Sequence, residues 1–177
     1  MSEVWTRMAI TPEKVENLDK WTEGALKRGA TALVLRFASP PPLSELWEWA
    51  KRWEGIPWIV HARWTKLPIG WGMHFPAPPL LPPPRPDPGY LYGQSCHTEE
   101  EVDLAIPWAS YMWIGPIFST PSHSGQTQLF SLDRLHRLCR KYPSFPLVAI
   151  GGIENEERIH QVKTAGAVGF AAIRYFL

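Results

Sequence analysis

The chain has 177 residues, of which 45% are hydrophobic and 20% charged, and its 18 basic and 17 acidic residues leave a formal net charge of +1. This composition is typical of one globular domain over residues 1–177, and the near-neutral charge argues against nucleic-acid binding through bulk electrostatics. Neither a long apolar run nor a signal-peptide pattern is present, so we expect a cytoplasmic protein with no membrane partner and two reduced cysteines.

The first half of the chain alternates apolar runs with amphipathic segments. A strand is expected over Val4–Thr11, and Thr11 then caps a helix that has Pro12 in its first turn. Gly29 is the signal that ends this helix. The next expected elements are a strand over Thr31–Phe37, a helix over Pro42–Gly55, and strands over Pro57–Ala62 and Gly72–Phe75.

The second half of the chain continues this alternation. Its expected elements are a strand over Leu91–His97, a helix from Thr98, a strand over Tyr111–Pro116, a helix over Ser131–Tyr142, a strand over Leu147–Gly151, a helix over Asn155–Ala165 and a strand over Gly169–Phe176. Thr98 and Glu101 match a capping box, in which each side chain bonds the other residue's backbone N–H.

Eight strands, five of them followed by a helix, predict an α/β fold with a parallel sheet and right-handed crossovers. The predicted architecture is a trimmed (β/α)8 TIM barrel that lacks the outer helices after strands 3, 4 and 8, and an open doubly wound sheet is the alternative. The missing eighth helix leaves apolar surface between strands 8 and 1. We expect a homodimer or the region around Trp5 to cover that surface.

Residues 76–88 hold eight prolines in the segment PAPPLLPPPRPDP. Proline lacks a backbone N–H and has a fixed φ, so the segment is excluded from helices and central strands. We expect a proline-rich, polyproline-like connection over the surface. Its P-x-x-P spacing leaves an SH3-type ligand as the alternative.

In barrels of this kind the active site lies at the carboxyl ends of the strands. Those ends carry Arg36, His61, His74, Ser95, His97, residues 115–120, Gly151, Gly152 and Arg174. The Gly151–Gly152 turn precedes a helix, so its backbone N–H groups can bind a phosphate, and Arg174 can add a positive charge. The alternatives are an ordinary glycine turn, a surface arginine, and histidines tied to backbone carbonyls.

Three segments stand out in the second half of the chain: GQSCHTEEEVDLA from Gly93, WIGPIFSTPSHSG from Trp113 and VAIGGIENEERIHQVKTAGAVGFAA from Val148. In their order and spacing, these three motifs resemble the thiamin phosphate synthase and TenI-like (thiazole tautomerase) superfamily. The resemblance implies phosphate contacts from Gly152, Ser95, Thr120, Ser122 and His123. The arginine of the family's Leu-Arg-Glu-Lys motif is retained as Arg36, which the resemblance implies is a substrate contact. Trp113, near the rim of the barrel, can stack on a flat heterocycle.

The departures from the family pattern concern its metal site. The synthase joins a pyrimidine pyrophosphate to a thiazole phosphate and needs Mg²⁺. Where the synthase has an Asn-Asp-Arg motif, this chain has His61-Ala62-Arg63, so alanine replaces a metal-binding aspartate. The synthase's second metal-binding aspartate follows a Gly-Val-His-Leu-Gly segment, and the corresponding segment here is GMHF followed by PAPP. Mg²⁺ prefers carboxylate oxygens beside substrate phosphates. We therefore expect no metal site and no cofactor, with Mg²⁺ required only if the synthase alternative holds through Asp87 or Glu154.

The TenI-like branch binds a thiazole carboxylate phosphate and catalyses a proton shift without metal. The proposed catalytic histidine of that branch is replaced here by Pro116, so the candidate proton carriers are His61, His97 and His74. His61 is the first candidate because it occupies the position of the synthase's metal site. The predicted function is thus a thiazole tautomerase with a small phosphorylated heterocycle as its ligand. The alternatives are a thiamin phosphate synthase and a non-catalytic phosphate-ligand binding or regulatory protein.

Overall fold

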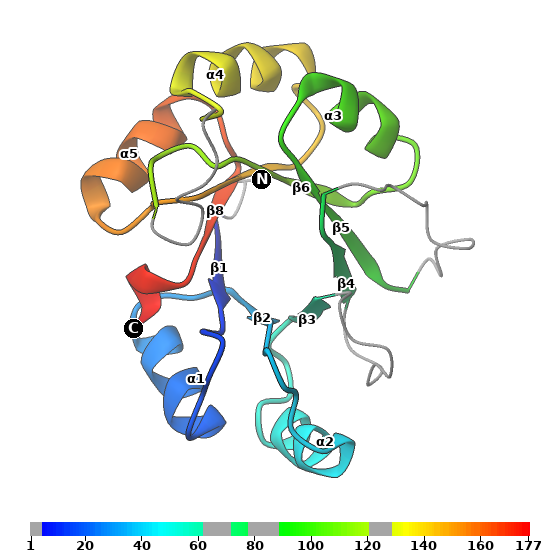
Figure 1. Cartoon of the computed structure of the whole chain (residues 1–177), viewed down its shortest axis with the longest axis vertical. Helices are drawn as coiled ribbons and strands as arrows, with labels where there is room; N and C mark the ends of the chain where they lie inside the picture. Colours follow the sequence, from blue (N-terminus) through cyan, green and yellow to red (C-terminus); the bar gives the residue numbers. More distant parts are fainter. Residues whose placement is uncertain (1–4, 62–71, 78–88, 121–128) are drawn as a thin grey trace.

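A computed structural model describes residues 5–61, 72–77, 89–120 and 129–177. Eight parallel strands pair in chain order, and β1 pairs with β8 to close the barrel (Figure 1). The strands are β1 (Thr6–Ile10), β2 (Ala32–Leu35), β3 (Trp58–His61), β4 (Gly72–Phe75), β5 (Leu91–Cys96), β6 (Tyr111–Ile114), β7 (Leu147–Ile150) and β8 (Gly169–Ala172). This closure confirms the barrel and excludes the open sheet.

The helices surround the barrel, as Figure 1 shows. They are α1 (Leu18–Lys27), α2 (Leu43–Arg52), α3 (Glu99–Ala105), α4 (Leu132–Lys141) and α5 (Glu156–Thr164). Within the described ranges they follow β1, β2, β5, β6 and β7, which agrees with the predicted trimmed architecture. The proline-rich segment falls mostly on residues 78–88, outside the described ranges. No helix in the described part of the chain is long and apolar enough to cross a bilayer.

The prediction that Thr11 caps the first helix is wrong. The Thr11 hydroxyl is buried and accepts a hydrogen bond from the Arg36 backbone N–H at 2.7 Å, so it joins β1 to the segment after β2. Asn17 caps α1 instead, because its side chain accepts the Lys20 N–H at 2.9 Å.

The capping box before α3 has an altered form. Thr98 accepts the Glu101 N–H at 3.2 Å, as predicted. The Glu101 carboxylate, however, accepts the backbone N–H of His97, one residue earlier than in the standard box. This contact ties α3 to the end of β5, where two candidate site residues lie.

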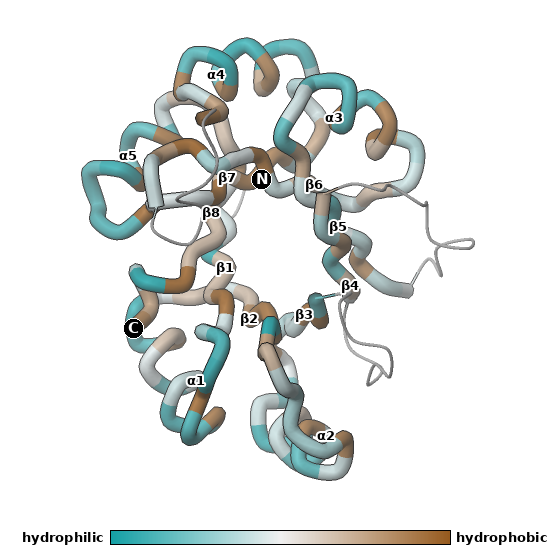
Figure 2. Tube along the Cα trace, in the orientation of Figure 1, coloured by the Kyte–Doolittle hydropathy of each residue, from teal (hydrophilic) through white to brown (hydrophobic). Residues whose placement is uncertain are grey.

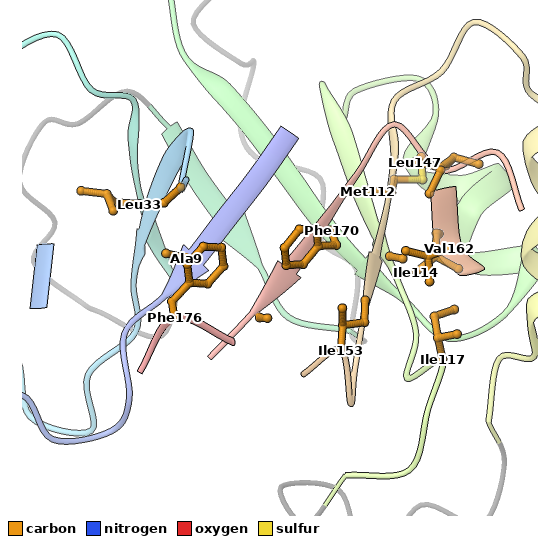
Figure 3. Packing of buried hydrophobic residues seen from close by; sticks show 14 of the residues in the cluster. Ala9, Leu33, Met112, Ile114, Ile117, Leu147, Ile153, Val162, Phe170 and Phe176 are labelled. Atoms are coloured by element: carbon orange, nitrogen blue, oxygen red, sulfur yellow. The ribbon is translucent and has the colours of Figure 1, made fainter. Parts of the chain in front are cut away.

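Buried side chains form two layers. Outward-facing strand residues such as Ala9, Leu33 and Phe170 share one buried cluster with helix residues such as Val162 (Figure 3), and the helices turn their hydrophilic sides to solvent (Figure 2). A second cluster fills the barrel itself: Met8, Ile10, Ala32, Val34, Ile59, Tyr111, Trp113, Val148 and Ala171. The alternation of Met8 and Ile10 with Ala9 between the two clusters is the two-residue period of a strand.

The chain after β8 is not a continued strand, contrary to the prediction over Gly169–Phe176. Arg174–Phe176 forms a 3₁₀ helix beside α1 (Figure 1), where it occupies part of the flank that an eighth helix would cover. Phe176 is buried and stacks on Phe170 with ring centroids 5.8 Å apart, and the Trp5 ring also lies beside Phe170, with centroids 6.4 Å apart. Trp5 thus helps to cover the apolar surface between β8 and β1, as one of the two expectations stated. The homodimer stays a prediction.

Candidate functional site

Two adjacent cavities open at the carboxyl ends of the strands. The larger has a volume of about 270 Å³ and is lined by Arg36, His61, Pro76, Ala77, Ser95, His97, Trp113, Gly115, Pro116, Ile150 and Gly151. The smaller has about 60 Å³ and is lined by Ile10, Arg36, Thr120, Ile150, Gly151, Gly152, Ile153, Glu154, Ala171, Ala172, Ile173 and Arg174. Arg36, Ile150 and Gly151 line both cavities, so the two form one continuous candidate site.

The turn after β7 requires glycine at two successive positions. Gly151 and Gly152 have φ values of 96° and 66°, in the left-handed region that side chains disfavour. A Cβ on Gly151 would lie 2.6 Å from the Cα of Pro116, and one on Gly152 would lie 2.7 Å from the Ser119 carbonyl oxygen. The turn is therefore packed directly against the loop after β6.

The same turn presents backbone donors to the smaller cavity. Among the described residues, no acceptor pairs with the backbone N–H groups of Gly152 and Ile153, which line that cavity just before α5. The Gly152 carbonyl accepts a hydrogen bond from the guanidinium of Arg158 in α5. A fixed turn whose N–H groups are unpaired among the described residues, beside a helix N-terminus, is an arrangement that can bind an anion.

Arg174 lies at the edge of the smaller cavity but already has a partner. Its guanidinium donates to the Glu154 carboxylate at 2.7 Å, and both side chains are about two-fifths exposed, at 40% and 38%. A pair this exposed is weak. Arg174 can therefore turn to an incoming anion.

Two of the three predicted histidines line the larger cavity. The Nδ1 atom of His97 lies 2.5 Å from the Gly115 carbonyl oxygen. A carbonyl can only accept, so Nδ1 carries the hydrogen and Nε2 is the basic atom of the neutral ring. His61 is buried, with 4% of its surface exposed, yet it lines the same cavity.

His74 lies deeper in the barrel. It is fully buried and is not among the cavity-lining residues. Its ring stacks on Trp113, and its two nitrogens contact the hydroxyls of Tyr111 and Ser95. Burial lowers the pKa of His74 well below its ordinary value, and the charges of His61 and Arg36 lower it further.

The structure brings most of the predicted site residues together. Arg36, His61, Ser95, Thr120, Gly151, Gly152, His97, Trp113 and Arg174 all line one or both cavities. Ser122 and His123 lie outside the described residues, as do Ala62 and Asp87. Sequence reasoning missed Tyr111, whose position two residues before Trp113 on a short strand was the available signal that both face the barrel interior.

The described residues do not fit a Mg²⁺ ion. Carboxylates are absent from the described lining of the larger cavity, and Glu154 at the smaller one is bonded to Arg174. Nowhere in residues 5–61, 72–77, 89–120 and 129–177 do three potential ligands from His, Cys, Asp or Glu gather. A hard cation needs several oxygen ligands, and the described part of the site offers mainly imidazoles, a guanidinium and backbone N–H groups.

Fold and site together define a small (β/α)8 barrel with a cavity at its C-terminal mouth. A solved structure with the same fold is the thiamine phosphate pyrophosphorylase from Pyrococcus furiosus. It superposes with a TM-score of 0.72 at 24% sequence identity, over 96% of this chain and 85% of that chain. At this level of identity the likeness concerns the fold.

The sequence places the chain in a family. The family model for thiamine monophosphate synthase matches residues 85–176, just over half of the chain, and the chain belongs to this thiamine-biosynthesis family. Thiamine-phosphate synthase from Lysinibacillus sphaericus is 40% identical over 86 residues, which make up 47% of this chain and 39% of that protein. Thiamine-phosphate synthase from Koribacter versatilis is 42% identical over 87 residues, or 49% of this chain and 40% of that protein. The matches therefore span about two-fifths of those relatives.

Proposed function

We propose that the chain binds a phosphorylated heterocycle of thiamine biosynthesis at the mouth of the barrel, with the phosphate in the smaller cavity and the ring in the larger one. The observation that carries this proposal is the adjacency of the two cavities across Arg36, Ile150 and Gly151. The smaller one offers backbone N–H donors and a helix N-terminus, and the larger one offers the indole of Trp113 as an aromatic surface.

For the reaction, we propose a metal-independent proton shift on a thiazole carboxylate phosphate. One base removes a proton from a ring carbon and one acid delivers a proton to a second carbon, so the ring becomes aromatic with no change in atom count. Imidazoles suit both steps because their ordinary pKa lies near neutrality. His97, with Nε2 as its basic atom, and His61 are the candidates that line the cavity.

The second candidate function is thiamin phosphate synthesis. It is favoured by the name that the relatives carry, thiamine-phosphate synthase. It requires an oxygen-rich cation site, and in the described ranges the larger cavity has no carboxylate in its lining. We therefore rank it below the proton shift.

One set of assays separates the candidates. The purified chain is incubated with the thiazole carboxylate phosphate alone, or with pyrimidine pyrophosphate and thiazole phosphate, each with and without Mg²⁺. A proton shift incorporates solvent deuterium into the thiazole and raises its aromatic absorbance without Mg²⁺. Mg²⁺-dependent release of pyrophosphate would instead establish the synthase, and ligand binding with neither reaction would establish a binding or regulatory protein.

Two variants identify the proton carrier. His61→Gln and His97→Gln each remove a cavity imidazole, and we expect one or both to lower turnover by about a hundredfold or more, in the range of general acid–base catalysis. His160→Gln is the matched control, because His160 is exposed on α5. Equal activity in all three variants would contradict an imidazole mechanism.

A further inference from the structure

Three polar side chains inside the barrel form one continuous chain of hydrogen bonds. The Nδ1 atom of His74 lies 3.0 Å from the Tyr111 hydroxyl oxygen, and its Nε2 atom lies 2.9 Å from the Ser95 hydroxyl oxygen. Tyr111 and His74 are buried, whereas Ser95 is half-buried and lines the larger cavity. The hydrogen-bonded chain therefore runs from the barrel interior to the candidate site.

The surroundings hold this arrangement in place. A Cβ on Gly93 would lie 2.3 Å from the Tyr111 hydroxyl oxygen and 2.4 Å from the His74 Nδ1 atom, so glycine alone leaves room for their contact. On one face of the imidazole, the Trp113 ring stacks with its centroid 3.6 Å away. Two hydrogen bonds, an aromatic wall and a glycine thus fix one orientation of the His74 ring.

The direction of the protons follows from the donors and acceptors. Burial raises the pKa of the Tyr111 phenol, which therefore keeps its hydrogen, and its partner among the described residues is His74. A buried hydroxyl left without an acceptor destabilises the folded state. The phenol accordingly donates to Nδ1, the ring hydrogen sits on Nε2, and Nε2 donates to the Ser95 oxygen.

We propose that Tyr111 and His74 are positioning residues that make Ser95 accept from the imidazole and direct its own hydroxyl hydrogen into the larger cavity, toward the anionic carboxylate that the ring of the proposed ligand carries there. This inference rests on the proposed function for the class of ligand. Neither Tyr111 nor His74 lines the cavity. Their effect on the ligand therefore passes through Ser95, and His74 acts by orienting a donor and does not itself exchange a proton with substrate.

The first test needs no ligand. Long-range ¹H–¹⁵N NMR spectra of the ¹⁵N-labelled chain distinguish the protonated from the unprotonated ring nitrogen of each histidine, and His74→Gln assigns the signal. We expect the Nε2–H tautomer in the wild type, and a second tautomer in Tyr111→Phe, which removes the phenol hydrogen and keeps the ring. An Nδ1–H tautomer in the wild type would overturn the proposal.

The second test measures the effect on an anion, with inorganic pyrophosphate as the probe in calorimetric titrations. We expect Ser95→Ala to weaken binding about tenfold and Tyr111→Phe about threefold, while the double variant is no weaker than Ser95→Ala alone, because both remove the same oriented donor. Tyr142→Phe, which removes a surface phenol on the far end of α4, leaves the affinity unchanged.

The outcomes separate this inference from the function on which it rests. If losses in the double variant add, Tyr111 acts independently of Ser95 and the positioning role is wrong. If Ser95→Ala has no effect, Ser95 presents no donor to the anion and the proposal is also wrong. If the wild type binds no pyrophosphate, the proposed anion site fails, and the NMR tautomer still decides whether the hydrogen-bonded chain has the inferred direction.

Discussion

The indole of Trp113 and the imidazole of His74 stack on each other inside the barrel, with ring centroids 3.6 Å apart and ring planes inclined by 28°. The Trp113 Nε1–H donates to the sulfur of Met8 at 3.3 Å, which ties this pair to β1 through the interior of the barrel. The two rings form the boundary between the larger cavity and the packed interior, since Trp113 lines the cavity and His74 is fully buried. The boundary keeps His74 away from solvent and therefore neutral.

The free energy of unfolding should depend on pH through His74. Burial lowers the pKa of His74 well below its ordinary value of 6.5, so below pH 6.5 the unfolded chain binds a proton that the folded chain does not. The stability contributed by the neutral ring is complete above this pH and is lost as the pH falls, by at most about 1.4 kcal/mol per pH unit.

Denaturant unfolding between about pH 5 and about pH 8 measures this slope, since these limits bracket the ordinary histidine pKa. We expect His74→Gln to have a flatter profile than the wild type at the acidic end. His160→Gln, which changes an exposed histidine on α5, should keep the wild-type slope. Parallel profiles for all three proteins would mean that His74 titrates normally in the folded state.

The second prediction concerns the turn after β7. Gly55→Ala introduces a side chain at a φ of 90° with no atom within 4 Å of the new Cβ, so it measures backbone strain alone, about 1 kcal/mol. Gly151→Ala adds a clash with Pro116 at 2.6 Å, and overpacking of this kind costs about 1–3 kcal/mol more. Equal losses of unfolding free energy in the two variants would show that the turn is not packed against the β6 loop as described.

The third prediction concerns the ion pair at the smaller cavity. Glu154→Gln frees the Arg174 guanidinium, so we expect inorganic phosphate to bind about threefold more tightly, and Arg174→Ala to weaken it about tenfold, the usual effect of losing one charged hydrogen bond. Unfolding free energies should change by less than about 1 kcal/mol, since the pair is exposed. Glu157→Gln is the matched control, with the same loss of charge in the first turn of α5. A similar gain in affinity in this control would assign the effect to net charge.

The fourth prediction concerns the segment after β8. Phe176 is 2% exposed and stacks on Phe170, so Phe176→Ala should lower the unfolding free energy by about 3–5 kcal/mol. Leu177→Ala removes a neighbouring side chain that is 57% exposed and should cost less than about 0.5 kcal/mol. If the two variants are equally stable, the 3₁₀ helix does not cover the flank between β8 and β1.

Much of the barrel follows from local sequence patterns, because each strand is a short apolar run between turn residues. Gly72–Phe75 coincides with β4, and strand-end reasoning found half of the residues that line the two cavities. Thr11 shows the limit of local patterns. A threonine before proline is a normal helix start. In the structure, however, the Thr11 hydroxyl bonds the backbone N–H of Arg36, 25 residues along the chain, and does not cap the helix.

How deeply each side chain is buried in the barrel could not be predicted from the sequence either. His61 is the last residue of β3 and His74 the last but one of β4, and the two pair in register, yet one lines the cavity and the other is fully buried. The difference depends on the stagger of the strands around the barrel and on which neighbours cover each ring. Tyr111 and Gly93 gain their roles only through contacts between separate strands, which no local pattern encodes.

The central claim is that this site binds a phosphorylated thiazole without a metal ion. The most direct measurement is a calorimetric titration of the chain with the thiazole carboxylate phosphate, in buffer with Mg²⁺ and in buffer with a chelator. We predict the same dissociation constant in both buffers and a marked loss of affinity in Gly152→Ala, whose Cβ would fill the turn. Binding that requires Mg²⁺, or no binding in either buffer, would contradict the account.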